Sequence, residues 1–266
     1  MTSCTIFNFT MENKLNIEKY NQASSRCATS APLFAGLFLS FVLGGCSNTK
    51  ATRIEARDNA VTLPELRMAY NFDHDKQAAS PHAGHAIELG VTKTSGSASQ
   101  ALTSGQLPII LDKTTFTAPQ QLINDFDLTY RELSWRYREF NYNEGKLGME
   151  ISAGLGNALI DLKVSTTTQI ASSRVDSYGA RAGLGLIYRL SASSSFQARG
   201  LVFYSPLHNF GVHDIERYEL VYAKAFFDNF RLRVGYAGLH VIGYNLVESD
   251  FKLEVSGPVL ALDMEF

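Results

Sequence analysis

The sequence has few cysteines, few charges and no apolar run long enough for a membrane-spanning helix. Of its 266 residues three are cysteines, Cys4, Cys27 and Cys46, so the chain after residue 46 has none. That absence excludes a disulfide-stapled domain and a thiolate metal site in residues 47–266. Charged residues make up 19% and the net charge is −2, which excludes a disordered acidic chain and a basic nucleic-acid binder. We therefore expect stability to come from a core or from a closed sheet.

The longest uncharged apolar run, PLFAGLFLSFVLGG, occupies residues 32–45. It is shorter than the roughly 20 residues of a spanning helix and has the length of the apolar part of a signal peptide. Lys14, Lys19 and Arg26 precede it as a weakly basic segment, and Met11 is an alternative start to Met1. A buried core helix is the other interpretation, which the Gly and Pro content and the polar segment after the run disfavour.

This run ends in Leu43-Gly44-Gly45-Cys46, which resembles the lipobox of bacterial lipoproteins. The resemblance implies that residues 1–45 are a signal peptide and that Cys46 becomes the lipid-modified first residue of the mature chain. A multiply acylated cysteine is a stable anchor, because each buried CH₂ contributes about 0.8 kcal/mol. Ser47 is not the aspartate that retains enteric lipoproteins in the inner membrane, so the resemblance implies the outer membrane of a Gram-negative bacterium.

Residues 83–266 alternate between apolar and polar positions in the way that membrane β-barrels do. From Leu147 to Leu155 the odd positions are apolar, while Lys146, Glu150 and small residues occupy the even positions. We predict an all-β fold, an antiparallel up-and-down barrel of about eight strands embedded in a membrane. The expected strands are 84–94, 125–140, 146–165, 175–190, 194–205, 214–227, 230–241 and 251–266. Residues 46–82 are expected to form a periplasmic linker, in which 63–72 is a short strand or an amphipathic turn.

Two changes of phase interrupt this alternation. The apolar residues slip by one position between Tyr130 and Leu133, which predicts a β-bulge. A second change at residues 154–157 leaves two interpretations of segment 146–165, one long bulged strand or two strands.

The connections between these strands predict the topology of the barrel. Short turns near Asn143, Ala192 and Asn229 all fall on one side, as the periplasmic turns of bacterial barrels do. A lipidated amino terminus and a carboxyl terminus on that same side require an even number of strands, which eight satisfies.

Three segments, GARAGLGLIYRL, LRVGYAGL and GPVLALDMEF, resemble the outer-membrane protein A-like families of eight-stranded barrels. Phe266, with Met264 and Leu262 before it, resembles the terminal signal read by the barrel assembly machinery. The resemblance implies a monomer that is surrounded by membrane lipids. Most small barrels lack a lipid anchor, so the lipobox is a departure from these families. An eight-stranded interior is filled by side chains, so we expect paired charges there in place of an open pore. The charged residues expected inside are Glu150, Arg181, Arg199, Arg217, Glu219, Arg231 and Arg233.

The leading functional hypothesis is a lipid-anchored, non-enzymatic outer-membrane barrel with a structural or surface-interaction role. A lipid-modifying enzyme is the second, because Ser205, His208, His213, Glu216 and His240 are candidates for a nucleophile and its base. The His-x-Ser arrangement of the outer-membrane deacylases is missing, so we expect no catalytic residues among them.

A soluble lipocalin-like barrel on a lipid anchor is the third hypothesis, because alternation alone does not say which face is inside. The Gly-x-Trp motif of lipocalins is missing, since Leu133 and Ser134 precede Trp135.

A histidine cluster raises the possibility of a metal site. His74, His82 and His85 lie near Asp73 and Asp75, but such a surface run binds divalent ions only loosely without supporting residues. We therefore expect no metal, no cofactor and no nucleic-acid partner.

Overall fold

The computed structural model describes residues 53–72, 83–206, 210–227, 229–245 and 249–266. The chain divides into two units, residues 1–49 and 50–266, and every described residue belongs to the second. Cys46 and the expected signal peptide therefore lie outside the described residues. Nothing helical in the described ranges is both long and apolar enough to cross a bilayer.

The described residues form twelve strands, which confirms the all-β prediction. Their bounds are β1 Ile54–Asp58, β2 Leu63–Asn71, β3 Gly84–Leu102, β4 Ile109–Leu111, β5 Thr114–Phe116, β6 Gln120–Tyr142, β7 Leu147–Ser165, β8 Ile170–Ser191, β9 Ser194–Tyr204, β10 Phe210–Phe227, β11 Phe230–Asn245 and β12 Phe251–Glu265.

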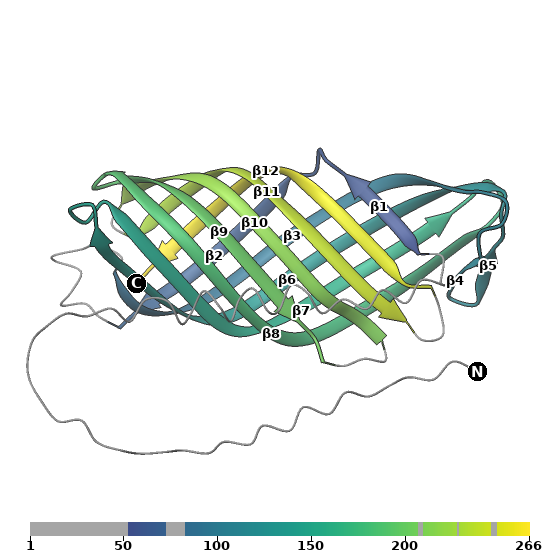
Figure 1. Cartoon of the computed structure of the whole chain (residues 1–266), viewed down its shortest axis with the longest axis horizontal. Coiled ribbons are helices and arrows are strands. Elements are labelled where there is room, and N and C mark those ends of the chain that lie inside the picture. The colour runs from purple at the N-terminus through teal and green to yellow at the C-terminus, as the bar shows by residue number, and fades with distance from the viewer. Residues whose placement is uncertain (1–52, 73–82, 207–209, 228, 246–248) are drawn as a thin grey trace, which may run out of the picture. The chain divides into compact units, whose positions relative to one another are not determined.

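Ten of these strands form one sheet that closes on itself (Figure 1). Their order is β1-β12-β11-β10-β9-β8-β7-β6-β3-β2, and a further pairing of β12 with β2 closes the ring. All eight expected segments are strands of this sheet, but the expected number of eight is wrong. Without β1, the ring itself has nine strands, because β2 joins it between β3 and β12.

The first strands run parallel to the last one. Ile54 of β1 pairs with Phe251, and Leu63 of β2 pairs with Val259, so β1 and β2 follow one another along the same edge of β12. Residues 59–62 face residues 256–258 between these pairings, which inserts one extra residue into the first strand. The segment expected to be a linker, 46–82, thus contributes two strands to the sheet.

This parallel pairing overturns the expected topology. A nine-stranded ring with parallel first and last strands puts the start of β2 and the end of β12 at opposite ends of the barrel. The described chain therefore enters the sheet at one end and finishes at the other. The expectation of an even number of strands, with both termini at the short-turn end, is therefore wrong.

The short turns lie where the sequence predicts them. Asn143, Glu144 and Gly145 connect β6 to β7 and all three have positive φ, a conformation that Asn and Gly adopt readily. Residues 192–193 connect β8 to β9, and the β10–β11 connection is also short. Alternate connections of antiparallel neighbours fall at the same end, so these three turns share one end, hereafter the short-turn end.

The predicted bulge at residues 130–133 is wrong. β6 pairs with β3 without interruption from Gln120 to Arg138, and its register shift against β7 lies later, between Glu139 and Tyr142. β7 is one strand from Leu147 to Ser165 with continuous pairing to β8, which decides between the two interpretations of segment 146–165. The phase of the apolar pattern changes without a bulge, because the apolar residues lie on the outer face in one part of each strand and on the inner face in the other part.

The barrel consequently has two halves of opposite polarity. In β7, Met149 and Ile151 lie on the outer face beside buried Glu150, whereas further along Ile160 is buried and Asp161 is exposed. The same reversal occurs in β6, where Leu128 is buried and Leu133 is exposed. One half therefore has an apolar outside and a charged inside, and the other has a polar outside and an apolar inside.

The boundary between the halves follows neighbouring residues from strand to strand. Val91 of β3 pairs with Arg131 of β6, Arg131 pairs with Asn157 of β7, and Asn157 pairs with Tyr178 of β8. Toward the short-turn end from this line the outer residues are apolar, and beyond it they are polar.

A small hairpin closes the end opposite the short turns (Figure 1). Asp112 and Lys113 both have positive φ, which is the geometry of a tight two-residue turn between β4 and β5. Ile109 and Phe116 are completely buried and join the apolar core of that half. Ser249 binds both backbone groups of Ile110 in the hairpin: its N–H donates to the Ile110 carbonyl and its hydroxyl accepts from the Ile110 N–H, each at 2.9 Å.

Candidate functional site

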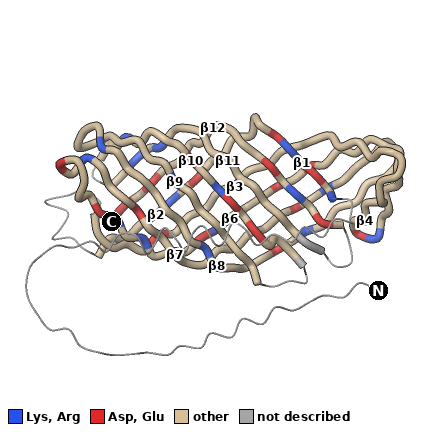
Figure 2. The backbone as a smooth tube through the Cα atoms, in the orientation of Figure 1, with Lys and Arg blue, Asp and Glu red and all other residues tan. Residues whose placement is uncertain are grey.

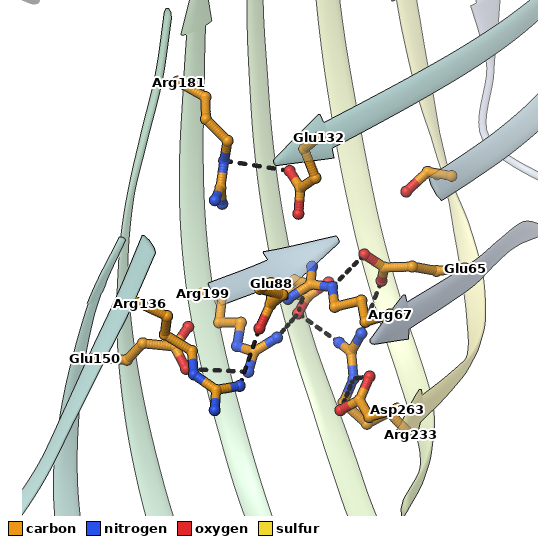
Figure 3. Close-up of polar contacts among 12 residues, drawn as sticks. Glu65, Arg67, Glu88, Glu132, Arg136, Glu150, Arg181, Arg199, Arg233 and Asp263 are labelled. Atoms are coloured by element: carbon orange, nitrogen blue, oxygen red, sulfur yellow. Dashed lines mark hydrogen bonds and ion pairs between the residues drawn. The ribbon is translucent and has the colours of Figure 1, made fainter. Parts of the chain in front are cut away.

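The most unusual feature of the barrel is the set of ionic side chains in its interior (Figure 3). Among the residues that the structure describes, seven arginines and seven carboxylates are buried, so their charges match in number. Burial without partners would be prohibitively costly for any of them. The buried arginines are Arg67, Arg136, Arg138, Arg181, Arg199, Arg217 and Arg233, and the buried carboxylates are Glu65, Glu88, Glu132, Glu150, Glu219, Asp263 and Glu265.

Glu65 of β2 is the best-connected carboxylate. It accepts from Arg67 at 2.5 Å, from Arg217 at 2.8 Å and from Arg233 at 2.9 Å. Arg217 comes from β10 and Arg233 from β11, so this one residue ties the first strand of the ring to strands near its end.

Glu219 of β10 carries a second set of contacts. Arg233 Nη1 and Arg217 Nη2 donate to it at 2.7 and 2.8 Å, and Arg199 approaches it to 3.5 Å. Arg233 in turn donates from Nε to Asp263 of β12 at 2.9 Å. Glu219 is therefore shared between several guanidinium groups, and Arg233 links it to Asp263.

The part of the network nearest the short-turn end is built around Glu265. Arg138 donates to it at 3.0 Å, and the guanidinium groups of Arg136 and Arg231 form ion pairs with it at 2.9 and 3.7 Å. Arg138 also donates to Glu150 of β7. Since these residues come from β6, β7, β11 and β12, the network spans the closing seam as well as the middle of the sheet.

One pair stands apart from the network. Arg181 of β8 lies 3.2 Å from Glu132 of β6, at the level where the interior becomes apolar (Figure 3). Among the described residues, Glu132 Oε1, Arg181 Nη1 and the Tyr130 hydroxyl are buried without a hydrogen-bond partner.

The expected interior charges are confirmed, but they are only part of the set. Arg231 is partly buried and the other six expected residues are buried, each with an ion-pair partner. Sequence analysis missed eight members, although alternation with the exposed residues Leu66 and Leu133 marks several of them. The missed residues are Glu65, Arg67, Glu88, Glu132, Arg136, Arg138, Asp263 and Glu265.

The outer face of the short-turn half carries a continuous belt of exposed apolar side chains, hereafter the apolar belt. Every strand of the nine-stranded ring contributes to it. Its members include Leu66, Met68, Tyr70, Ile87, Leu89, Val91, Leu133, Trp135, Met149, Ile151, Leu155, Tyr178, Leu184, Leu186, Tyr188, Phe196, Val202, Tyr204, Tyr218, Leu220, Val234, Tyr236, Leu260 and Phe266. A surface patch of this size is far beyond the few hundred Å² that water-soluble monomers expose.

Charged residues occur in both halves of the barrel (Figure 2), and in the other half many of them are exposed on the outer face. Arg174 lies 3.7 Å from Asp161, and Lys252 lies 2.7 Å from Glu254. The hydrogen bond from the Lys252 ammonium lowers the pKa of the Glu254 carboxyl. Exposed pairs of this kind are typical of a solvated surface and add little stability.

Those candidate catalytic residues that the structure describes do not assemble into a nucleophile and base. The Ser205 hydroxyl is buried and donates to the Tyr178 carbonyl at 2.8 Å, so its proton points to the backbone. His213 contacts Asp214 at 2.6 Å, and His240 lies 3.5 Å from Glu216 across the β10–β11 pair. His208 lies outside the described residues.

The histidine cluster offers no metal centre in the described part of the chain. His85 accepts a hydrogen bond from the Trp135 indole at 3.2 Å and stacks on that ring. His74, His82, Asp73 and Asp75 lie outside the described residues. Among the residues that are described, no group of three or more histidine, cysteine or acidic side chains is placed to hold a metal ion.

No protein-family model, no curated protein and no solved structure matches this chain. The assignment of function therefore depends on the apolar belt and the ionic interior.

Proposed function

We propose that this protein is a lipid-anchored, non-enzymatic barrel of the bacterial outer membrane, with a structural or surface-interaction role. The observation that carries the proposal is the reversal of polarity between the two halves of the barrel, which is seen within single strands such as β6 and β7. Water favours charge outside and apolar residues inside, so the half with the apolar belt is suited to hydrocarbon and the other half to water.

The height of the apolar belt supports this proposal. Transmembrane strands need about 9–11 residues when tilted by about 45°. The belt occupies residues 178–188 on β8, 196–204 on β9 and 258–266 on β12. These lengths are what a bilayer requires, and the rest of each longer strand would stand in water.

The ionic interior and the apolar core support a structural role. Charges fill one half of the barrel, an apolar core fills the other, and the β4–β5 hairpin packs into that core. A barrel whose interior is filled by side chains is better suited to act as a scaffold that displays loops than to act as a channel.

The topology supports a proposal for the two ends of the described chain. β1 begins at Ile54 in the polar half, and Phe266 lies with the short turns at the other end. With the short turns in the periplasm, β1 would begin on the cell-surface side.

The proposal is tested by membrane fractionation of the wild type and of Cys46→Ala. Both proteins should resist extraction by carbonate and urea, and both should change gel mobility on heating, because the barrel spans the membrane with or without lipid. A soluble Cys46→Ala protein without heat-dependent mobility would replace the proposal with an anchored soluble barrel. Incorporation of a labelled acyl chain into the wild type, and its loss in Cys46→Ala, tests the lipid itself.

A further inference from the structure

We propose that the barrel interior binds an ordered water molecule between Arg181 and Arg199, which joins the separate Arg181–Glu132 pair to the main ionic network. A cavity of about 20 Å³ lies there, lined by residues of β2, β7, β8, β9 and β10. A cavity can hold a water molecule when it exceeds roughly 10–15 Å³ and offers two to four polar partners. The size of this cavity therefore fits a single small ligand.

Two guanidinium groups at the cavity carry donors without hydrogen-bond partners. The donor atoms are Nε and Nη1 of Arg181 and Nε and Nη1 of Arg199, and all four are buried. Arg181 Nε lies 3.2 Å from the Glu132 carboxylate, and Arg199 Nη1 lies 3.5 Å from the Glu219 carboxylate. Both arginines are thus paired in charge, although these two contacts lack the geometry of a hydrogen bond. Because a guanidinium group can only donate, the ligand that these atoms bind must be a hydrogen-bond acceptor.

The carboxylates at the same cavity favour a neutral ligand over an anion. Glu150 and Glu219 line the cavity beside the arginines, so their charges would repel an anion. A water molecule can accept from a guanidinium group and donate to a carboxylate at the same time. Glu150 already accepts from Arg199 Nη2 at 3.2 Å, which places an acceptor next to the donors of Arg199. Water therefore satisfies both kinds of group that line the cavity.

Glycine at an inward position of β8 provides the space for this ligand. Gly183 lines the cavity, and a Cβ atom added to it would lie 2.7 Å from Ser152 Oγ and 3.4 Å from Arg181 Nη2. Figure 3 shows the Arg181 guanidinium group directed from β8 toward the level of Arg199 and Glu150. A larger residue at position 183 would therefore occupy the space beside that guanidinium group.

The test is a crystal structure of the full-length protein in detergent, at a resolution that shows ordered water, from crystals soaked in sodium bromide. We expect density for one oxygen atom within hydrogen-bonding distance of Arg181 and Arg199, without the anomalous signal of bromine. An anomalous peak in the cavity would replace the water by a halide ion, and a cavity without density would show that nothing is bound. Either of these two results would overturn the proposal.

Gly183→Ala tests the same site in solution. Its methyl group should displace the water, and the equilibrium constant for unfolding should rise about tenfold, because buried donors lose their partner. Gly200→Ala on the neighbouring strand is the matched control, since Gly200 is exposed and an added Cβ atom would have no other atom within 4 Å. It should leave the unfolding constant nearly unchanged.

A second background separates the loss of water from a steric clash. Ser152 Oγ is the atom nearest to the methyl group of Gly183→Ala, so Ser152→Ala removes the clash. Gly183→Ala should destabilise the Ser152→Ala protein as much as it destabilises the wild type. If Gly183→Ala has no effect in that background, or the same effect as Gly200→Ala in the wild type, the proposal is wrong.

Discussion

Leu63 of β2 and Val259 of β12 are partners in a parallel pairing that closes the barrel. Because the closing strands run in the same direction, the amino-terminal strand starts at the end opposite the short turns. The polar half, including exposed Arg57 of β1 and Lys113 of the β4–β5 hairpin, then lies on one side of the proposed membrane, and Asn143 lies on the other.

This arrangement predicts the labelling of single cysteines in intact cells. Arg57→Cys and Lys113→Cys should react alike with a membrane-impermeant maleimide, and Asn143→Cys should differ from both. All three should react after the cells are broken, which controls for buried thiols. Shared labelling of Arg57→Cys with Asn143→Cys, and not with Lys113→Cys, would rule out the parallel closure.

A charge placed in the apolar belt should be costly only if the belt lies in a bilayer. Leu184 is exposed near the middle of the belt on β8, and Ser99 is exposed on the outer face of β3 in the polar half. Leu184→Arg should lower the free energy of unfolding in lipid vesicles by about 2–4 kcal/mol, the cost of arginine at the bilayer midplane. Ser99→Arg is the control and should change it little. Equal effects of the two substitutions would argue against membrane embedding.

The sequence predicted eight of the ten strands of the sheet because alternation is a local signal. It failed at residues 95–102, 120–124 and 170–174, where β3, β6 and β8 extend further than expected. These stretches are polar on the outside, so they resemble loops when only an apolar outer face is sought. The slip between Tyr130 and Leu133 has the same origin. Where β6 passes from one half of the barrel to the other, the apolar residues change from its inner face to its outer face.

The ionic interior was predictable only in part. Alternation places Glu65 and Arg67 opposite Leu66, but it does not say which distant residue they meet. Glu65 pairs with Arg217 and Arg233, more than 150 positions away, because β2 closes the ring beside β12. A short segment near the amino terminus that seemed to be a linker thus supplies the best-connected carboxylate.

Removal of one partner from the network should be strongly destabilising. Arg233 is completely buried and bonds to Glu65, Glu219 and Asp263. Arg233→Met leaves those carboxylates with fewer cations in the interior, and we expect a loss of about 3–5 kcal/mol in the free energy of unfolding. Denaturant titration of the folded barrel, followed by tryptophan fluorescence of Trp135, measures it. Arg174→Met, which removes an exposed ion pair, should leave stability nearly unchanged, and a similar loss in both variants would mean that the network adds nothing specific.

The β4–β5 hairpin should stabilise the polar half through its apolar side chains. Phe116 is completely buried in the core of that half, whereas Thr115 beside it on the same strand is exposed. Phe116→Ala removes the ring and leaves a cavity, so we expect a loss of about 3–5 kcal/mol. Thr115→Ala, the control, should have little effect. Because the hairpin lies beyond the apolar belt, trypsin added to barrels in vesicles should cut the Phe116→Ala protein faster at Lys113 than the wild type. Unchanged cleavage would mean that the hairpin rests on the barrel end without contributing to its core.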